Sequence, residues 1–268
     1  YTTEESSAAS DVYKRQVVFN ILRGGLNFGL RGSLARAFGW NNHSSSFVTA
    51  QRARVIESPE QWHITEDEYK KITFPQRAQI IIGDVVATGT SLKHGLDIMI
   101  KEAVKEGMEL GSILFFTIGG PKSEERLIEA DKACRRNFSH YEGTHVCYVE
   151  GRFSVPTTES KVSIKITGTD LMRCNSLLAP EFLESNFESP SYPLERCTIY
   201  DAGSRAFQIE EYREDVIDYW TKVLTLAKTM TFEEMMVERF PEIDIKTFGS
   251  VSLEQVARDQ LQKLAGPL

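Results

Sequence analysis

The chain has 268 residues and a mass of 30.3 kDa, with 41% apolar and 26% charged residues. These values are typical of globular proteins and exclude a disordered or fibrous chain. No apolar run approaches the roughly 18 residues that a membrane span needs. The net charge of −7 excludes a broad basic surface for nucleic acid but allows a local cationic pocket. We therefore expect a cytoplasmic protein that binds neither membrane nor nucleic acid.

The metal-binding residue types show no ligand spacing. The four cysteines include no CxxC pair, and no two of the five histidines lie four residues apart. Zinc sites and catalytic triads with histidine therefore have no support in the sequence. We expect free thiols, as in a reducing compartment.

The first 16 residues are small and polar, without an apolar stretch of the kind found in secretory signals. The apolar pattern begins abruptly at Val17. We expect residues 1–16 to be non-native or disordered and to lie outside the fold.

Beyond Val17, strands and helices alternate. The predicted strands are apolar runs of strand length, at residues 17–22, 46–50, 78–83, 112–118 and 145–150. The predicted helices carry apolar residues at helical spacing, at residues 26–38, 92–106, 122–137, 213–230, 232–240 and 252–264. This alternation predicts an α/β fold with a central, mostly parallel sheet flanked by helices.

Three segments depart from the alternation. Residues 52–76 are charged and contain two prolines, which predicts an irregular functional or mobile loop. Residues 161–168 alternate apolar and polar side chains, which predicts an antiparallel or edge strand. Residues 175–199 contain three prolines and are predicted to be irregular. We expect one domain over residues 17–207 and a helical extension over residues 208–268.

The segment at residues 80–91, IIIGDVVATGTS, carries the clearest chemistry. It predicts a buried strand, an acid at the carboxyl end of that strand, a loop of small residues and then a helix. Backbone amides, hydroxyls and the positive end of a helix dipole would hold a phosphate in such a loop. Asp84 stands beside the loop, where a carboxylate accepts hydrogen bonds from sugar hydroxyls. The lysine of a Walker A motif and the GxGxxG pattern are both absent.

Residues 80–91 resemble the ribose-phosphate motif of type I phosphoribosyltransferases, and the ATG-x-S loop is most similar to that of the uracil phosphoribosyltransferase branch. In that family two adjacent acids hold the ribose of phosphoribosyl pyrophosphate, and the loop holds its 5-phosphate. This chain has Gly83 at the first acidic position and keeps only Asp84. The resemblance implies that one hydroxyl contact is lost or supplied elsewhere.

Two arginine-bearing segments precede this motif. Residues 21–26, ILRGGL, are similar to the pyrophosphate loop of the family, where glycines allow close approach and Arg23 adds a cation. In the uracil branch a flexible loop carries an arginine that closes over the pyrophosphate. Arg52, with Arg54 as second choice, holds the matching place in this chain.

Residues 200–207, YDAGSRAF, resemble the GDAGDRLFG signature of uracil phosphoribosyltransferases. In the family this segment belongs to a hood over the base, and its first aspartate reaches the ribosyl pyrophosphate through magnesium or water. Tyr200 and Ser204 differ from that signature.

Family members also carry an N-terminal arm before the first strand. This chain shows none, so we expect its native N-terminus to be truncated.

The resemblance implies transfer of a 5-phosphoribosyl group from phosphoribosyl pyrophosphate to a nucleobase, uracil being favoured, with release of pyrophosphate, in a homo-oligomer that uses Mg²⁺. The residues implied for catalysis are Arg23, Arg52, Asp84 and Asp201, the last holding metal indirectly. The residues implied for the ribosyl pyrophosphate are Arg23, Gly24, Gly25, Asp84, Val85, Val86, Ala87, Thr88, Gly89, Thr90 and Ser91. The residues implied for the base are Tyr200, Asp201 and Ala202. Two alternatives stay open: a non-catalytic module that senses phosphoribosyl pyrophosphate or a nucleotide, and an interaction protein that acts through its C-terminal helices.

Overall fold

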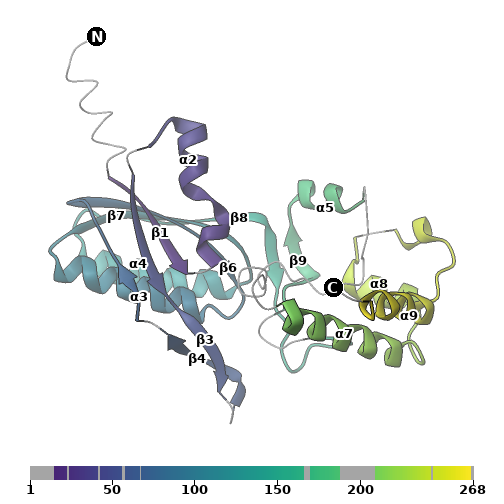
Figure 1. Ribbon diagram of the computed structural model, residues 1–268. Helices are drawn as coiled ribbons and strands as arrows, with labels where there is room; N and C mark the ends of the chain where they lie inside the picture. The colour runs from purple at the N-terminus through teal and green to yellow at the C-terminus, as the bar shows by residue number, and fades with distance from the viewer. Residues whose placement is uncertain are drawn as a thin grey trace. The chain divides into compact units, whose positions relative to one another are not determined.

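The computed structural model describes residues 15–22, 24–41, 43–55, 58–66, 68–165, 170–187, 209–242 and 244–266. The chain forms two compact units, residues 1–149 and residues 150–268 (Figure 1). This boundary differs from the division at residue 207 that we expected. Among the described residues, no helix has the length and apolar character needed to cross a membrane.

The central sheet has the strand order β5-β2-β1-β6-β7-β8-β9. Its strands are β1 (Gln16–Leu22), β2 (Ser44–Thr49), β5 (Lys70–Lys71), β6 (Arg77–Val86), β7 (Glu109–Gly119), β8 (Gly143–Ser154) and β9 (Met172–Leu178). The central strands β2, β1, β6 and β7 pair in parallel. The end strands β5 and β9 are antiparallel to their neighbours. The predicted α/β fold with a mostly parallel sheet is confirmed, and β1 begins one residue earlier than expected.

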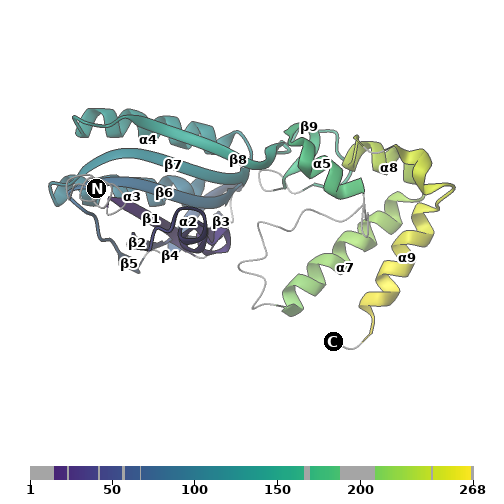
Figure 2. The same ribbon diagram turned by 90° about the horizontal axis from the view of Figure 1, so that it is seen from above.

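The helices of the first unit cover both faces of the sheet. They are η1 (Gly24–Phe28), α2 (Leu30–Phe38), α3 (Thr90–Lys105) and α4 (Lys122–Asn137). α3 and α4 lie together on one face, and α2 lies on the other (Figures 1 and 2). The helix predicted over residues 26–38 is divided at Gly29, whose φ of 56° ends η1 and begins α2. Lys122–Asn137 is a helix with the predicted bounds.

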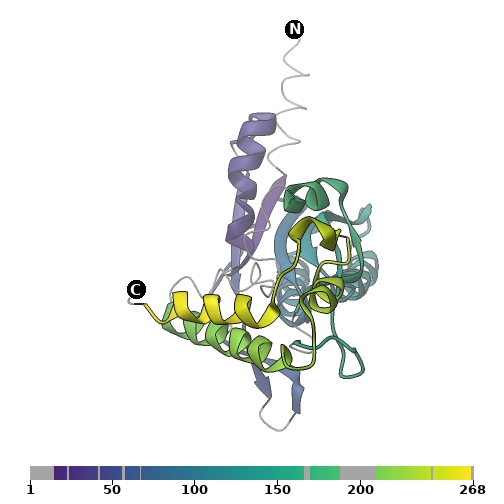
Figure 3. The ribbon, with the colours of Figure 1, turned by 90° about the vertical axis from the view of Figure 1, so that its right-hand side faces the viewer.

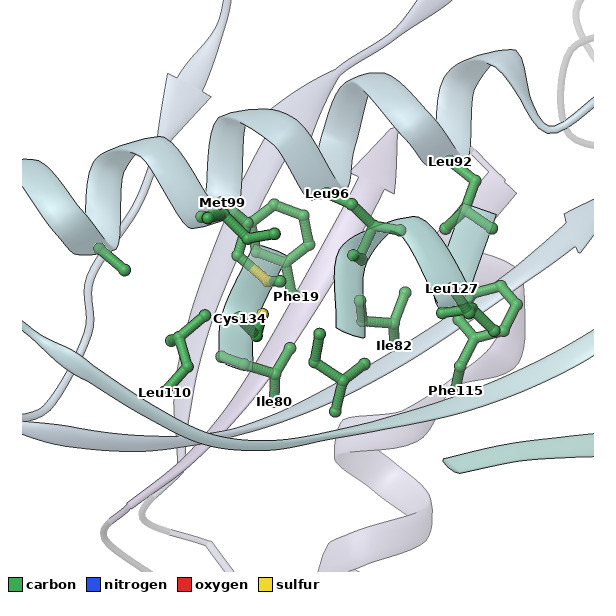
Figure 4. Packing of buried hydrophobic residues seen from close by; sticks show 14 of the residues in the cluster. Phe19, Ile80, Ile82, Leu92, Leu96, Met99, Leu110, Phe115, Leu127 and Cys134 are labelled. Atoms are coloured by element: carbon green, nitrogen blue, oxygen red, sulfur yellow. The ribbon is translucent and has the colours of Figure 1, made fainter. Parts of the chain in front are cut away.

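The core of the first unit lies between the sheet and α3 and α4 (Figure 4). Alternate residues of β6, Ile80 and Ile82, point toward these helices together with Phe115 of β7 and Phe19 of β1. Leu92, Leu96 and Met99 meet them from α3; all these side chains are buried. Burial of this apolar surface fixes the register of β6 and therefore the position of the residues at its carboxyl end.

The predicted irregular segment at residues 52–76 is wrong in its first half. β3 (Gln51–Val55) and β4 (Ser58–Glu66) form an antiparallel hairpin with its own two-stranded sheet. The prolines mislead because Pro59 lies in a strand that pairs on one side only, where a missing N–H is tolerated. The short strand β5 follows and pairs with β2.

The second unit has an apolar core of its own. Its helices are α5 (Pro180–Phe187), α7 (Ile209–Leu226), α8 (Phe232–Arg239), η3 (Ile245–Phe248) and α9 (Leu253–Leu264). α7 and α9 pack side by side (Figure 3). Trp220 and Val223 of α7 are buried with Phe232 and Met236 of α8. The three C-terminal helices predicted from periodicity are therefore confirmed, although α7 begins at Ile209 and ends at Leu226.

The edge strand predicted over residues 161–168 is wrong in its described part, because residues 161–165 form a bend. Side chains of α8 take the backbone hydrogen bonds that a partner strand would have taken. The Ser163 amide and hydroxyl both donate to the carboxylate of Glu238, at 2.7 and 2.8 Å. The Arg239 guanidinium donates to the Ile164 carbonyl. β9 and α5 instead arise in the region from 170 to 187, so the prediction of an irregular segment over residues 175–199 is wrong for residues 175–178 and 180–187.

Candidate functional site

The carboxyl ends of four parallel strands lie at one edge of the first unit's sheet. β2, β1, β6 and β7 are neighbours and run in the same direction. Each is followed there by a segment with small residues, and ligands of open α/β sheets bind at such an edge. The segments are residue 50 with the start of β3, the glycines of η1, residues 87–89, and residues 119–121.

The loop between β6 and α3 has the form expected of a phosphate cradle. Gly89, the N-cap of the 16-residue helix α3, adopts the left-handed conformation, with φ 72° and ψ 6°, and has no side chain to cap the helix. The Thr88 hydroxyl oxygen accepts a hydrogen bond from the Thr90 amide at 3.4 Å, and the Thr88 hydroxyl donates to the Thr90 hydroxyl oxygen at 3.3 Å. The positive end of the α3 dipole and the amides of its first turn therefore face an edge built from small residues.

Ser91 connects the loop to the end of β2. Its hydroxyl donates to the Ala50 carbonyl across 2.9 Å, so the first turn of α3 is held against the residue that precedes β3. The predicted phosphate loop is thus also the anchor of the β3–β4 hairpin. The hydroxyl proton of Ser91 is engaged in this contact, whereas the oxygen keeps acceptor capacity.

Asp84 is buried to 8% exposure near the carboxyl end of β6. It is on the same sheet face as Ile80 and Ile82, the face covered by α3 and α4. Its Oδ1 accepts a hydrogen bond from the Val85 amide at 2.9 Å, and its register partner on β7 is the buried Thr117. A carboxylate has about four acceptor sites, so this orientation is compatible with a further bond to a sugar hydroxyl.

Gly83, next to Asp84 on β6, is covered by an aromatic ring. A Cβ built on Gly83 would lie 2.6 Å from Cγ and 2.7 Å from Cβ of Phe28, distances that require one side to move. Phe28 comes from η1, whose Gly25 also approaches the Gly83 carbonyl so closely that a Cβ there would lie 3.1 Å from the oxygen. The space beside Gly83 is therefore filled by Phe28 on the sheet face opposite Asp84.

Two cations of α4 lie beside the loop and were not predicted from the sequence. A Cβ built on Gly89 would lie 3.1 Å from Cγ of Arg126 and 3.4 Å from Cβ of Lys122. Arg126 donates to both oxygens of Glu129, at 2.9 and 3.1 Å, while its buried Nε has no hydrogen-bond partner among the described residues. Lys122 pairs with Glu125 at 2.7 Å. The available signal was their position in the first turns of the helix that follows the next parallel strand.

The structure brings only part of the predicted site together. Gly24 and Gly25 lie in η1, and residues 84–91 lie at the end of β6 and in the first turn of α3, all at the same sheet edge. Arg52 lies in β3, with Ile64 as its register partner. Arg23, Tyr200, Asp201 and Ala202 lie outside the described residues, so their roles stay predictions.

No protein-family model and no curated protein sequence matches this chain. One solved structure that is similar to it is the hypoxanthine phosphoribosyltransferase from Trypanosoma cruzi in complex with the product IMP, at 13% sequence identity and a TM-score of 0.27. The similarity covers 66% of this chain and 87% of that chain. A TM-score this low does not support a function for this chain.

Proposed function

We propose that the protein is a phosphoribosyltransferase, which transfers a 5-phosphoribosyl group from phosphoribosyl pyrophosphate to a nucleobase and releases pyrophosphate. The observation that carries the proposal is the unit of β6, Asp84, the loop at residues 87–89 and the first turn of α3 with its glycine N-cap. This unit offers a carboxylate for a sugar beside amides for a phosphate. The loop of the uracil branch, which residues 87–91 resemble, makes uracil the favoured base and salvage the favoured role.

The chemistry asked of these residues is positioning and charge stabilisation. The first turn of α3, with Lys122 and Arg126 beside it, would hold the 5-phosphate, and Asp84 would orient the ribose. The bond from the anomeric carbon to the pyrophosphate oxygen breaks as the base nitrogen attacks from the opposite face. Arg23 and Arg52 would stabilise the charge on the departing pyrophosphate, and Asp201 with Tyr200 and Ala202 would face the base.

Magnesium fits this site as part of the substrate. Among the residues that the structure describes, no group of three His, Cys, Asp or Glu side chains could hold a metal ion. Mg²⁺ is often held by one or two carboxylates together with substrate phosphates. Asp84 offers one carboxylate at the sheet edge, so the ion would enter bound to the diphosphate.

The test is an activity assay with the full chain. The protein is incubated with phosphoribosyl pyrophosphate, Mg²⁺ and each common base in turn, and released pyrophosphate is measured. We expect release with at least one base and loss of release when Asp84 is changed to Asn. Absence of pyrophosphate with every base would refute the enzyme.

A second candidate is a module that binds phosphoribosyl pyrophosphate or a nucleotide without turnover. The observation that favours it is the Gly83–Phe28 contact, which leaves this sheet edge with one acid where the family has two. It predicts binding of phosphoribosyl pyrophosphate in calorimetry at concentrations where no pyrophosphate is released. Pyrophosphate release above the rate of the buffer alone would exclude it.

A further inference from the structure

The two positions at the end of β6 that can contact a sugar lie on opposite faces of the sheet. Asp84 is on the face of α3 and α4, and Gly83 is on the face of η1 and α2, since successive residues of a strand alternate. Only Asp84 offers a hydrogen-bond acceptor from its side chain. The apolar ring of Phe28 lies where a side chain at residue 83 would begin.

We infer that the site distinguishes a single ring hydroxyl of its phosphosugar, through Asp84, and accepts a sugar that lacks the other hydroxyl. This inference rests on the proposed function and concerns its substrate class. The site binds 5-phosphosugars with one hydroxyl fewer as well as the ribose compounds. Phe28 is the residue that determines this specificity, because it occupies the side on which a second acceptor would stand.

The neighbouring polar groups do not replace the missing acceptor. Asn20, on the same face as Gly83, is buried in the sheet, where its Nδ2 donates to the carbonyls of Val18 and Ser46, each at 3.3 Å, and keeps the side chain away from the exposed edge. Thr117, next to Asp84 on β7, is fully buried within the sheet. Of Asp84 and its two polar neighbours Asn20 and Thr117 in the sheet, Asp84 is thus the side chain suited to a sugar hydroxyl.

The expected selectivity follows from hydrogen-bond energetics. A hydrogen bond from a hydroxyl to a charged acceptor is stronger than one between neutral groups, so the analogue without that hydroxyl binds more weakly, whereas an apolar pocket discriminates weakly. Loss of the hydroxyl held by Asp84 is expected to weaken binding about tenfold or more. Loss of the hydroxyl on the Phe28 side is expected to change binding by no more than about threefold.

Calorimetry with the full chain tests this, with ribose 5-phosphate, 2-deoxyribose 5-phosphate and 3-deoxyribose 5-phosphate as probes. One deoxy compound is expected to bind within about threefold of ribose 5-phosphate and the other about tenfold or more weaker. Two weakened deoxy compounds, or two unchanged ones, would overturn the inference. If none of the three binds, the proposed function itself fails, which is a distinct result.

A variant pair assigns the selectivity to Phe28. In F28G with G83D, the three atoms closest to the added Cβ are all removed, and both deoxy compounds are expected to bind about tenfold weaker than ribose 5-phosphate. F38A is the matched control, since Phe38 is an exposed phenylalanine of α2 that stacks on Trp40; its selectivity is expected to equal that of the wild type. An unchanged selectivity in a folded F28G/G83D protein would overturn the role of Phe28, and the wild-type comparison stands without this variant.

Discussion

Gly89→Ala tests the loop between β6 and α3 most directly, and Gly107→Ala is its matched control. Both glycines have positive φ, 72° and 67°, and they flank opposite ends of α3. Near Gly107 no atom lies within 4 Å of an added Cβ. The Gly107 variant should therefore lose about 1–2 kcal/mol of stability, which is the cost of holding an alanine in the left-handed conformation.

The Gly89 variant carries a second cost. Its Cβ would lie 3.1 Å from Cγ of Arg126 and 3.3 Å from the Lys122 carbonyl oxygen, so the start of α4 must shift by a few tenths of an ångström. We expect about 1 kcal/mol of crowding beyond the left-handed cost, hence about 2–3 kcal/mol in total. At about 2–4 °C for each kcal/mol, its thermal midpoint should fall further than that of Gly107→Ala.

Binding separates the two variants more sharply. In Gly89→Ala, displacement of the loop and of Arg126 should weaken the binding of ribose 5-phosphate about tenfold or more, because charge-assisted contacts to the phosphate contribute about 1.5–3 kcal/mol each. Gly107→Ala should bind as the wild type does. Scanning calorimetry gives the midpoints, and titration calorimetry gives the affinities. Wild-type affinity in a folded Gly89→Ala protein would refute the phosphate cradle.

Three further predictions concern single side chains. Arg126→Gln should weaken the affinity for ribose 5-phosphate about fivefold to tenfold in titration calorimetry. Arg136→Gln, in the last turn of the same helix, should leave the affinity unchanged, and equal effects of the two changes would contradict a specific contact with Arg126. Burial raises the pKa of Cys134 to about 12, so at pH 8 a thiol reagent should label the exposed Cys147 and spare Cys134 until urea unfolds the chain, as read by mass spectrometry. Burial also raises the pKa of Glu150, so the folded state binds the carboxyl proton more tightly than the unfolded state. The protein therefore loses stability as the pH rises from the ordinary pKa of glutamate to the raised pKa in the folded state. Glu150→Gln should raise the urea midpoint at pH 7, and an equally large gain at pH 4 would contradict the cost of burying this charge.

The strands and helices that carry the site could be predicted because their patterns are local. The run at residues 80–82 and the helical spacing of Leu92, Leu96 and Met99 predict β6 and α3. The loop between them follows from its composition. Each of these elements buries one continuous apolar surface against the same core, so periodicity alone indicates its place.

The features that could not be predicted depend on residues far apart in the chain. The bend at residues 161–165 is stabilised by Glu238 and Arg239, and a partner 75 residues away leaves no trace in local alternation. The β3–β4 hairpin pairs only with itself, so its charged sequence shows no one-sided pattern. Arg126 is next to Gly89 only because α4 follows the strand beside β6.

The Gly83–Phe28 contact bears on whether this site catalyses or only binds. A phosphate loop serves an enzyme and a binding module equally, so it does not separate the two. The loss of a hydroxyl contact weakens the binding of the substrate and of the transition state equally. Such a uniform loss of binding changes KM more than kcat. Glycine at residue 83 therefore predicts weaker substrate binding, and measurements at other residues must show whether turnover is lost as well. The groups that we propose to act only as pyrophosphate departs are cations, which makes Arg23→Gln and Arg52→Gln the decisive variants: an enzyme with either change is expected to have a lower kcat, and a binding module a changed affinity alone.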